Sequence, residues 1–498
     1  MRRRTFCKTT LAAAVAAAIP GCGRDMPPAA TDVGSLIPAV SSAGAEISIE
    51  TVAIGELAGS LSGRLYLQAD EGYAAAKRVW NGMFDHKQPA MVVQCLSTDD
   101  VVNAVNFARE RNLLVSVKGG GHSYPGKSTS DGGMMIDLSQ MHAVDVDADG
   151  NAPNGHKTAR VDGGALLAHL DGAALQHNLL TTTGIVSHTG VGGFTLGGGM
   201  GRTDRMMGLA IDNLLAATVV TASGDVVRAS EDENADLFWG LRGGGGNFGI
   251  VTEFVYRLHP FNPTVYGGDL IYDVDKNFLE HYAELLDTVP DEANIEPVFM
   301  PGEDGNMIAI VGVVWGGDHA AGEKALASML AFPGLKGGEL GPKSYQAIQT
   351  QLDGVLAHGG QSYLKSGFLN ELTPEVIEIM VDFVNRGTIS SWFQHLGGAT
   401  SRVAPDATAF AHRNVAVNFG IDYSSRDPAQ NEAGIAAVRE FYTALAPHMA
   451  GFYTNLHDDT EKKTWGNYGP NYPRLVELKN QYDPTNLFRL NANIRPTV

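Results

Sequence analysis

Glycine constrains this chain more than any other residue type, because its 60 glycines gather into short runs rather than spreading evenly over 498 residues. The densest runs fall within 119–121, 190–201 and 243–249. Glycine runs mark places where the backbone turns sharply or approaches a partner closely. Three such loops in one chain predict a large ligand that is held mainly by backbone.

The elements around these loops predict an α+β lobe. Apolar runs predict strands at 91–93, 113–117, 134–138 and 250–258, and a helical period covers 98–111. The first glycine run follows one of these strands directly, and the third leads into another. After Pro260 the chain mixes strands and helices without glycine runs, which predicts a second lobe that covers the first.

The glycine loops do not match the common nucleotide-binding motifs. A P-loop ends in Gly-Lys-Ser/Thr, and none of the three loops supplies that ending. Gly244, Gly246 and Gly249 have the spacing of a dinucleotide fingerprint, but that motif lies between a strand and a following helix. Here a helix is predicted before the loop and a strand after it, which argues against a Rossmann domain.

The first glycine loop has the features of an anion site with a reactive side chain at its end. Consecutive glycines let several backbone N–H groups turn toward one anion, and a pyrophosphate suits such a nest. His122 follows directly, where an imidazole nitrogen could bond to an electrophilic carbon of a cofactor. The alternative is an ordinary hydrogen-bonded loop histidine.

Four sequence segments favour a cofactor-bonding role of His122 over that of an ordinary loop histidine. They are KGGGHSYPG at 118–126, GIVSHTGVGGFTLGGGMG at 184–201, DLFWGLRGGGGNFGIVTEF at 236–254 and YDPTNLFRLNANI at 482–494. In order and spacing they resemble the berberine bridge enzyme-like FAD-linked oxidases, and the resemblance runs from about Pro89 to the C-terminus. Coincidence does not explain four motifs in sequence.

The resemblance implies an α+β fold with a two-lobed PCMH-type FAD-binding domain and an α/β substrate domain whose sheet covers the flavin. The expected parts are the FAD-binding domain at 86–260, the substrate domain at 261–450, and a C-terminal segment at 451–498 that returns to the FAD-binding domain. Residues 1–45 are predicted to be an export signal and a flexible linker, because the stretch up to about Ala45 is rich in Pro, Ala, Ser and Gly.

The resemblance also implies FAD bound covalently through His122 to the flavin 8α carbon. Many family members add a second link from a cysteine four residues before the glycine that corresponds to Gly190, but Val186 stands there, so a single link is expected. The other implied cofactor-binding residues come from all three glycine loops and the tail: Lys118, Gly119, Gly120, Gly121, Ser123, Gly126, Gly190, Gly192, Gly193, Thr195, Gly198, Gly199, Gly249, Ile250, Val251, Asn491 and Asn493.

The catalytic base is less well defined. Family members often use tyrosines, one of them in a Tyr-x-Asn-Tyr segment, and here Leu456 replaces the second tyrosine after Tyr453. The candidate bases are therefore Tyr453, His457 and His395. His395 lies in a segment that resembles a family strand over the flavin, but it is equally compatible with a buried structural histidine. Strand alternation allows only one of His395 and Gln394 to face the ring.

These features predict an oxidase that converts an alcohol or amine of a small organic substrate to a carbonyl or imine, while dioxygen is reduced to hydrogen peroxide. A dehydrogenase with another electron acceptor, or a flavin-binding protein without turnover, would carry the same FAD motifs. Acidic residues outnumber basic ones 55 to 36, and the formal charge of -19 opposes nucleic-acid binding. No cluster of His, Cys and carboxylates has the spacing of a metal site.

The N-terminus predicts export. Arg3 and Arg4 precede an apolar run too short to span a membrane, which resembles a twin-arginine signal, with an ordinary secretory signal as the alternative. Cys22 is a candidate for lipid attachment, although Pro20 fits that cleavage motif poorly. We expect a periplasmic or extracellular protein, without an internal disulfide because only Cys95 follows the signal region.

Overall fold

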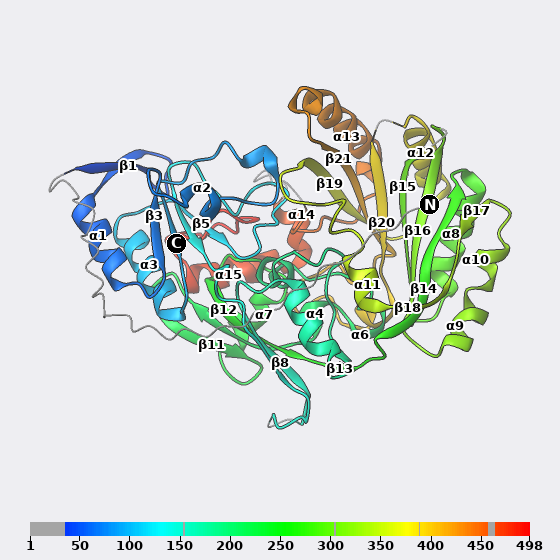
Figure 1. Cartoon of the computed structure of the whole chain (residues 1–498), viewed down its shortest axis with the longest axis horizontal. Coiled ribbons are helices and arrows are strands. Elements are labelled where there is room, and N and C mark those ends of the chain that lie inside the picture. Colours follow the sequence, from blue (N-terminus) through cyan, green and yellow to red (C-terminus); the bar gives the residue numbers. More distant parts are fainter. Residues whose placement is uncertain (1–34, 153–154, 303–304, 388, 457–463) are drawn as a thin grey trace, which may run out of the picture.

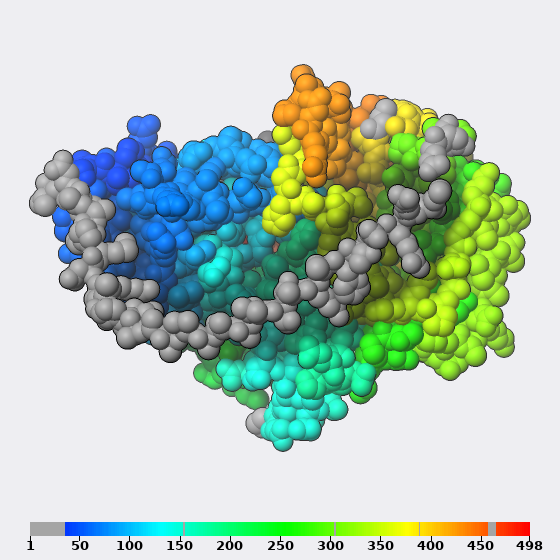
Figure 2. Space-filling view, in the orientation of Figure 1, coloured from blue at the N-terminus to red at the C-terminus, as the bar shows by residue number. Residues whose placement is uncertain are grey.

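The computed structural model describes residues 35–152, 155–302, 305–387, 389–456 and 464–498. The fold is α+β, as predicted, and it has two lobes that meet along a common boundary (Figures 1 and 2). The first lobe contains the chain up to about Pro260, and the second contains one large sheet with its helices. The C-terminal helix α15 (Tyr472–Tyr482) lies in the first lobe.

The first glycine loop leaves a four-stranded sheet at the carboxyl end of its edge strand. The order is β3 (Arg64–Leu67), β4 (Met91–Gln94), β6 (Met134–Asp137) and β5 (Val115–Lys118), and β4, β6 and β5 are parallel. Helix α3 (Thr98–Glu110) makes the crossover that parallel strands require. The Ser97 side chain caps it by accepting a hydrogen bond from the Asp100 N–H.

A five-stranded antiparallel sheet carries the third loop. Its order is β11 (Val226–Ser230), β10 (Leu214–Val220), β12 (Ile250–Arg257), β8 (Thr158–Asp162) and β7 (Val144–Asp147). Helices α4 (Leu167–Leu175) and α7 (Ala235–Leu241) pack on it. Leu475, Leu478 and Ile494 of the C-terminal segment are buried in the same core, so the end of the chain completes this lobe.

The second lobe is a large antiparallel sheet covered by helices on one face. Its main path is β17 (Leu335–Gly338), β14 (Thr264–Asp273), β16 (Met307–Trp315), β15 (Ala293–Pro301), β20 (Ser390–His395), β21 (Val417–Ser425) and β19 (Gln361–Leu369), with β18 (Gly341–Ser344) also pairing with β14. Helices α8 (Lys276–Thr288), α12 (Pro374–Asn385) and α13 (Asn431–Leu445) bury their apolar sides against it. Strand alternation leaves every second side chain for the opposite face.

Shorter elements connect these layers. They are α2 (Tyr73–Ala76), β9 (Leu179–Leu180), α5 (Val191–Leu196), α6 (Asp204–Met207), β13 (His259–Pro260), α9 (His319–Ala325), α10 (Ala327–Ala331), α11 (Tyr345–Thr350) and α14 (Thr464–Tyr468). Of these, α5 contributes to the wall of the cavity described below, and so do the residues directly after α11.

The predicted linker is wrong in its last part. Residues 36–45 were expected to be flexible, but β1 (Leu36–Val40) pairs with β2 (Glu46–Glu50), and helix α1 (Thr51–Ser60) follows. Ala39 and Ile49 are buried in the core that also holds β4 and α3. Small residues favour a linker, but the alternation of side chains in β1 and β2 lets these strands bury Ala39 and Ile49 on one face.

The predicted export signal and Cys22 lie outside the described residues. Within the part of the chain that the structure describes, no helix combines the length and apolarity needed to cross a membrane.

Candidate active site

A cavity of about 860 Å³ lies between the two lobes, and residues of all three glycine loops line it. The tail contributes Phe488, Leu490, Asn491 and Ala492, and the second lobe contributes side chains from the open face of its sheet. This volume is near the upper end of the range of roughly 300–1,000 Å³ that is typical of ligand pockets. The four motifs, distant in the sequence, thus surround one space.

The first two glycine loops touch each other at the cavity wall. A Cβ on Gly120 would lie 2.3 Å from the Gly190 nitrogen, and one on Gly190 would lie 2.2 Å from the Gly120 nitrogen, so neither position accepts a side chain. Among the described residues, none accepts a hydrogen bond from the N–H groups of Gly120, Gly121 or His122. This wall therefore offers unpaired donors in a glycine cradle, which fits the pyrophosphate of a dinucleotide.

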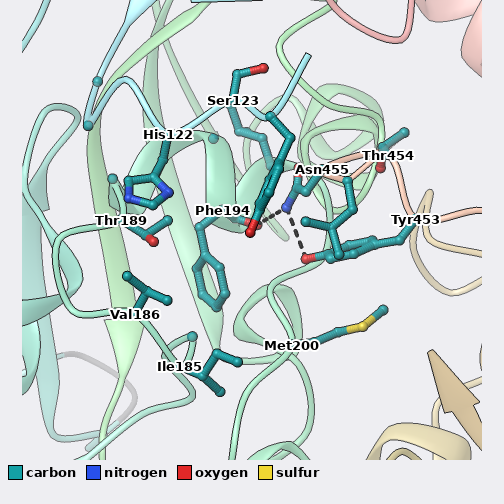
Figure 3. A pocket seen from close by; sticks show the side chains of 18 of the residues that line it. His122, Ser123, Ile185, Val186, Thr189, Phe194, Met200, Tyr453, Thr454 and Asn455 are labelled. Atoms are coloured by element: carbon teal, nitrogen blue, oxygen red, sulfur yellow. Dashed lines mark hydrogen bonds between the residues drawn. The ribbon is translucent and has the colours of Figure 1, made fainter. Parts of the chain in front are cut away.

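His122 lines the cavity at the end of this cradle (Figure 3), and the rings of His188 and His358 lie near it. Its Nε2 is 2.7 Å from Nδ1 of His188, and its ring stacks on Trp80 at 4.6 Å between centroids. Burial, followed by the neighbouring His188 and His358, holds the pKa of His122 well below its usual range. The ring is therefore neutral near pH 7, and a nitrogen that carries a lone pair is a nucleophile.

Val186 lines the cavity near His122, in the place predicted for it (Figure 3). Its side chain is buried and offers no sulfur. Within the described ranges the free cysteine is Cys95, which is buried directly after β4 and does not line the cavity.

Tyr453 lines the cavity from the C-terminal segment (Figure 3). Its hydroxyl accepts hydrogen bonds from the Gly199 N–H at 3.0 Å and from Nδ2 of Asn455 at 2.9 Å. These donors favour the phenolate, but burial is the larger effect and raises the pKa of Tyr453 to about 12. The phenol is therefore protonated at neutral pH.

Of the two histidines proposed as bases, His395 does not join this group. His395 of β20 lies on the helix-covered face of the sheet, since it shares that face with Phe393, a residue of the helix-side core. Burial, and secondarily Arg205, lowers the pKa of His395. Gln394 lines the cavity instead, so the base role predicted for His395 does not fit its position. His457 lies outside the described residues.

The open face of the large sheet forms the opposite wall. Strand pairing places Asp269 and Glu296 on either side of Gly312, with Gln394 next in the row after Glu296. Two residues farther along β20, the Trp392 side chain lies on the same face. Ser390 follows on that face and is paired with Asp422 of β21. Burial raises the pKa of Asp422 to about 6. This wall is rich in hydrogen-bond acceptors, which suits a substrate that carries hydroxyl or amino groups.

Most residues predicted to bind the cofactor line the cavity. Those in its wall are Gly119, Gly120, Gly121, His122, Ser123, Gly190, Gly192, Gly193, Gly249, Ile250, Val251 and Asn491. Asn491 also donates to the Gly246 carbonyl at 2.9 Å, which ties the tail to the third loop.

Six predicted cofactor residues do not line the cavity: Lys118, Gly126, Thr195, Gly198, Gly199 and Asn493. Lys118 points into the lobe, where it pairs with Asp137 at 3.2 Å and donates to the Ala76 carbonyl. Gly126 packs against the Phe84 ring, which a Cβ would approach to 2.4 Å. These positions shape the loops, and a sequence motif does not separate such support from direct contact.

The sequence analysis missed several residues at the site, among them Trp80, His188 and Asp422. His188 carried a signal, because it is a second histidine two residues before Gly190. Asp422 is a carboxylate between Ile421 and Tyr423 in a mostly buried strand, which is also a signal. Trp80 lies before the predicted domain boundary at 86 and has no local signal, since only the tertiary fold brings it to His122.

In the described part of the chain, no group of three or more His, Cys, Asp or Glu side chains is arranged to hold a metal ion.

Family models match both halves of the site. One, described as an FAD binding domain, matches residues 89–230, and one described as berberine and berberine like matches residues 452–495. These two matches contain the first two glycine loops and the segment of Tyr453.

Individual proteins match nearly the whole chain. An FAD-linked oxidoreductase of Dictyostelium discoideum is 32% identical, over 90% of this chain and 97% of that protein. The (R)-6-hydroxynicotine oxidase of Paenarthrobacter nicotinovorans is 29% identical, over 88% of this chain and 97% of its own length. The solved glucooligosaccharide oxidase of Acremonium strictum, described with a 6-S-cysteinyl, 8α-N1-histidyl FAD, is 26% identical with a TM-score of 0.80, over 90% of this chain and 100% of that one.

Proposed function

We infer the reaction from the premise that this chain belongs to the berberine bridge enzyme-like FAD-linked oxidoreductases. It is an enzyme with an FAD-binding domain. Within that class we propose an oxidase that converts an alcohol or amine of a small organic substrate to a carbonyl or imine and reduces dioxygen to hydrogen peroxide. The observation that carries the proposal is the single cavity in which the glycine cradle, His122 and Tyr453 face the polar sheet.

The residues of the cavity fit FAD. The cradle at Gly120 and Gly190 would hold the pyrophosphate, and the tail with Asn491 would flank the dinucleotide. We propose that His122 links to the flavin through Nδ1, because its Nε2 is engaged with His188. Val186 at the place of the usual cysteine supports a single link.

Bound FAD accepts a hydride from the substrate. Tyr453 is placed to take the hydroxyl or amino proton of a substrate that lies between it and the sheet face, and the donors Gly199 N–H and Asn455 Nδ2 stabilise the phenolate that does so. Asp269, Glu296 and Asp422 accept hydrogen bonds from substrate hydroxyl or ammonium groups and disfavour anionic substrates.

Acid precipitation tests the link. We expect the flavin colour of the wild-type protein to stay with the pellet, and that of His122→Ala to move to the supernatant. A second variant, His122→Ala with Val186→Cys, is expected to regain pellet colour, because the thiol then stands where relatives have their second link. Loss of all colour from the wild-type pellet would contradict the covalent assignment.

The electron acceptor separates the oxidase from its rivals. With a substrate found by anaerobic bleaching of the flavin absorbance, an oxidase yields one hydrogen peroxide per turnover in air. A dehydrogenase gives little peroxide and needs an added quinone or dye, and a non-catalytic flavoprotein is not bleached by any substrate. These three outcomes are distinct in a single series of measurements.

We propose further that the protein is exported already folded through the twin-arginine route, to the periplasm or beyond. Export after folding allows the cofactor to be inserted first, and a covalent bond prevents its loss outside the cell. Replacing Arg3 and Arg4 by lysine is expected to hold the protein in the cytoplasm. Fractionation measures this, and labelling with a lipid precursor tests attachment at Cys22.

A further inference from the structure

A cluster of three histidines extends from His122, in the cavity wall, toward the surface. His122 contacts His188 at 2.7 Å between Nε2 and Nδ1, and the ring of His188 lies 5.3 Å from that of His358. His122 and His188 are partly buried, whereas His358 is exposed. The three histidines therefore lie in sequence from the cavity, at His122, to the surface, at His358.

His188 is held firmly by its neighbours in the chain. The N–H and hydroxyl of Ser187 both donate to the Asp353 carboxylate, at 2.9 and 2.5 Å. On the other side, the Thr189 carbonyl accepts the Leu167 N–H at 2.9 Å. The short contact between the imidazoles is thus made from a fixed backbone and not from a free loop.

The contact couples the tautomers of His122 and His188. Its 2.7 Å length requires one ring nitrogen to donate and the other to accept. When Nε2 of His122 donates, its Nδ1 carries the lone pair and is the nucleophile. Without an acceptor at His188, the proton is free to sit on Nδ1, where it blocks attack.

Resting on the proposed function, we propose that His188 is a positioning residue for covalent attachment of the flavin, which holds the proton of His122 on Nε2 and then accepts it. One bond forms, from His122 Nδ1 to the 8α carbon, and one C–H bond of that methyl group breaks. The methyl proton, the Nε2 proton and two electrons reduce dioxygen to hydrogen peroxide. The Nε2 proton passes to Nδ1 of His188, which lies 2.7 Å away.

The test follows attachment rather than turnover. Full-length variants are purified, incubated with FAD in air, and sampled over time for flavin that stays with acid-precipitated protein. We expect His188→Ala to attach flavin on the order of 100-fold more slowly than wild type. His188→Asn retains an acceptor oxygen near the place of Nδ1. We therefore expect it to attach flavin at least about tenfold faster than His188→Ala does.

Two controls make the outcome clear. His142→Ala removes an exposed histidine paired with His169 outside the cavity, and attachment is expected at the wild-type rate. Binding of FAD before attachment, followed by flavin fluorescence, reports whether each variant keeps its cavity. The proposal is overturned if His188→Ala attaches flavin at the wild-type rate, or if His188→Asn is no faster than His188→Ala. A wild-type protein that retains no flavin would instead contradict the proposed function.

Discussion

Burial acts in the same direction on two different residues of the cavity, since it favours the neutral form of each. It lowers the pKa of His122, so the imidazole is free to act as a nucleophile, and it raises the pKa of Tyr453 to about 12, so the phenol keeps its proton. Desolvation thus favours the nucleophilic form of His122. For Tyr453 it opposes the phenolate, so the proposed role as a base depends on the hydrogen bonds that the phenolate receives.

Replacing Tyr453 by phenylalanine tests its proposed role as the base. We expect flavin reduction by substrate to slow by about 100-fold or more. For wild type the rate is expected to rise with pH up to about 12, because deprotonation of Tyr453 produces the base. Stopped-flow reduction without oxygen measures both. Tyr256→Phe removes another buried hydroxyl, one bonded to Thr195 outside the cavity wall, and is expected to reduce at the wild-type rate.

Asp171 makes stability depend on pH. It is buried in α4, where Thr183 and Gln349 donate to it, yet burial raises its pKa to about 7. A raised carboxyl pKa contributes stability that is complete below the unfolded value near 3.8 and is lost as pH rises through about 7. The shift corresponds to a loss on the order of 4 kcal/mol.

Asp171→Asn removes this titration, so its free energy of unfolding is expected to fall less between pH 5 and 8 than that of wild type. Urea unfolding at the two pH values measures the difference. Asp149→Asn, at an exposed carboxylate, is the matched control and should follow wild type. Equal slopes for wild type and Asp171→Asn would contradict the assignment.

At the scale of elements, the end of α15 positions the tail that lines the cavity. Lys479 and Asp483, both fully buried, pair at 2.7 Å across one helical turn. Lys479 also donates to the carbonyls of Asn247 and Phe488, while Asp483 accepts the N–H groups of Leu487 and Phe488. One ion pair thus joins the helix, the third glycine loop and the tail.

Breaking this pair should cost far more than breaking an exposed one of the same spacing. We expect Lys479→Met to lower the free energy of unfolding by about 3–5 kcal/mol, because Asp483 is left charged and buried. Lys276→Met, in the exposed pair with Glu280, should cost less than about 0.5 kcal/mol. Thermal or urea unfolding compares them, and equal losses would show that the buried pair has no special role.

At the scale of the whole molecule, Arg205 is one of the arginines that join the two lobes. Arg205 of α6, in the first lobe, is buried and donates to the carbonyls of Val289, Pro290, Ala293 and Leu396 in the second. Gln349 of α11 reaches in the other direction to Thr183 and Gly184. These bonds fix the sheet face over the glycine loops.

Arg205→Leu should loosen this boundary. It leaves several buried carbonyls without donors, at about 1–3 kcal/mol each, so we expect at least about 3 kcal/mol of destabilisation and weaker flavin retention before attachment. Arg402→Leu removes an exposed arginine paired with Asp291 and should cost less than about 1 kcal/mol. Urea unfolding and the rate of flavin release measure the two effects.

The sequence alone predicted the glycine loops, their elements and their convergence on one cofactor, because glycine runs and apolar periods are local properties of the chain. It also predicted which links of a covalent flavin are chemically available, since His122 is present and Val186 replaces a cysteine. The likeness of four motifs extended this to the α+β fold of two lobes.

Only the tertiary structure decided which side chains meet. His395 and Gln394 are neighbours in sequence, and strand alternation required them to separate, but the helices packed on one face determined that Gln394 takes the cavity. Likewise the contacts of His122 with Trp80 and His188 join residues up to 66 positions apart. Such contacts depend on how sheets and loops pack, which no local pattern records.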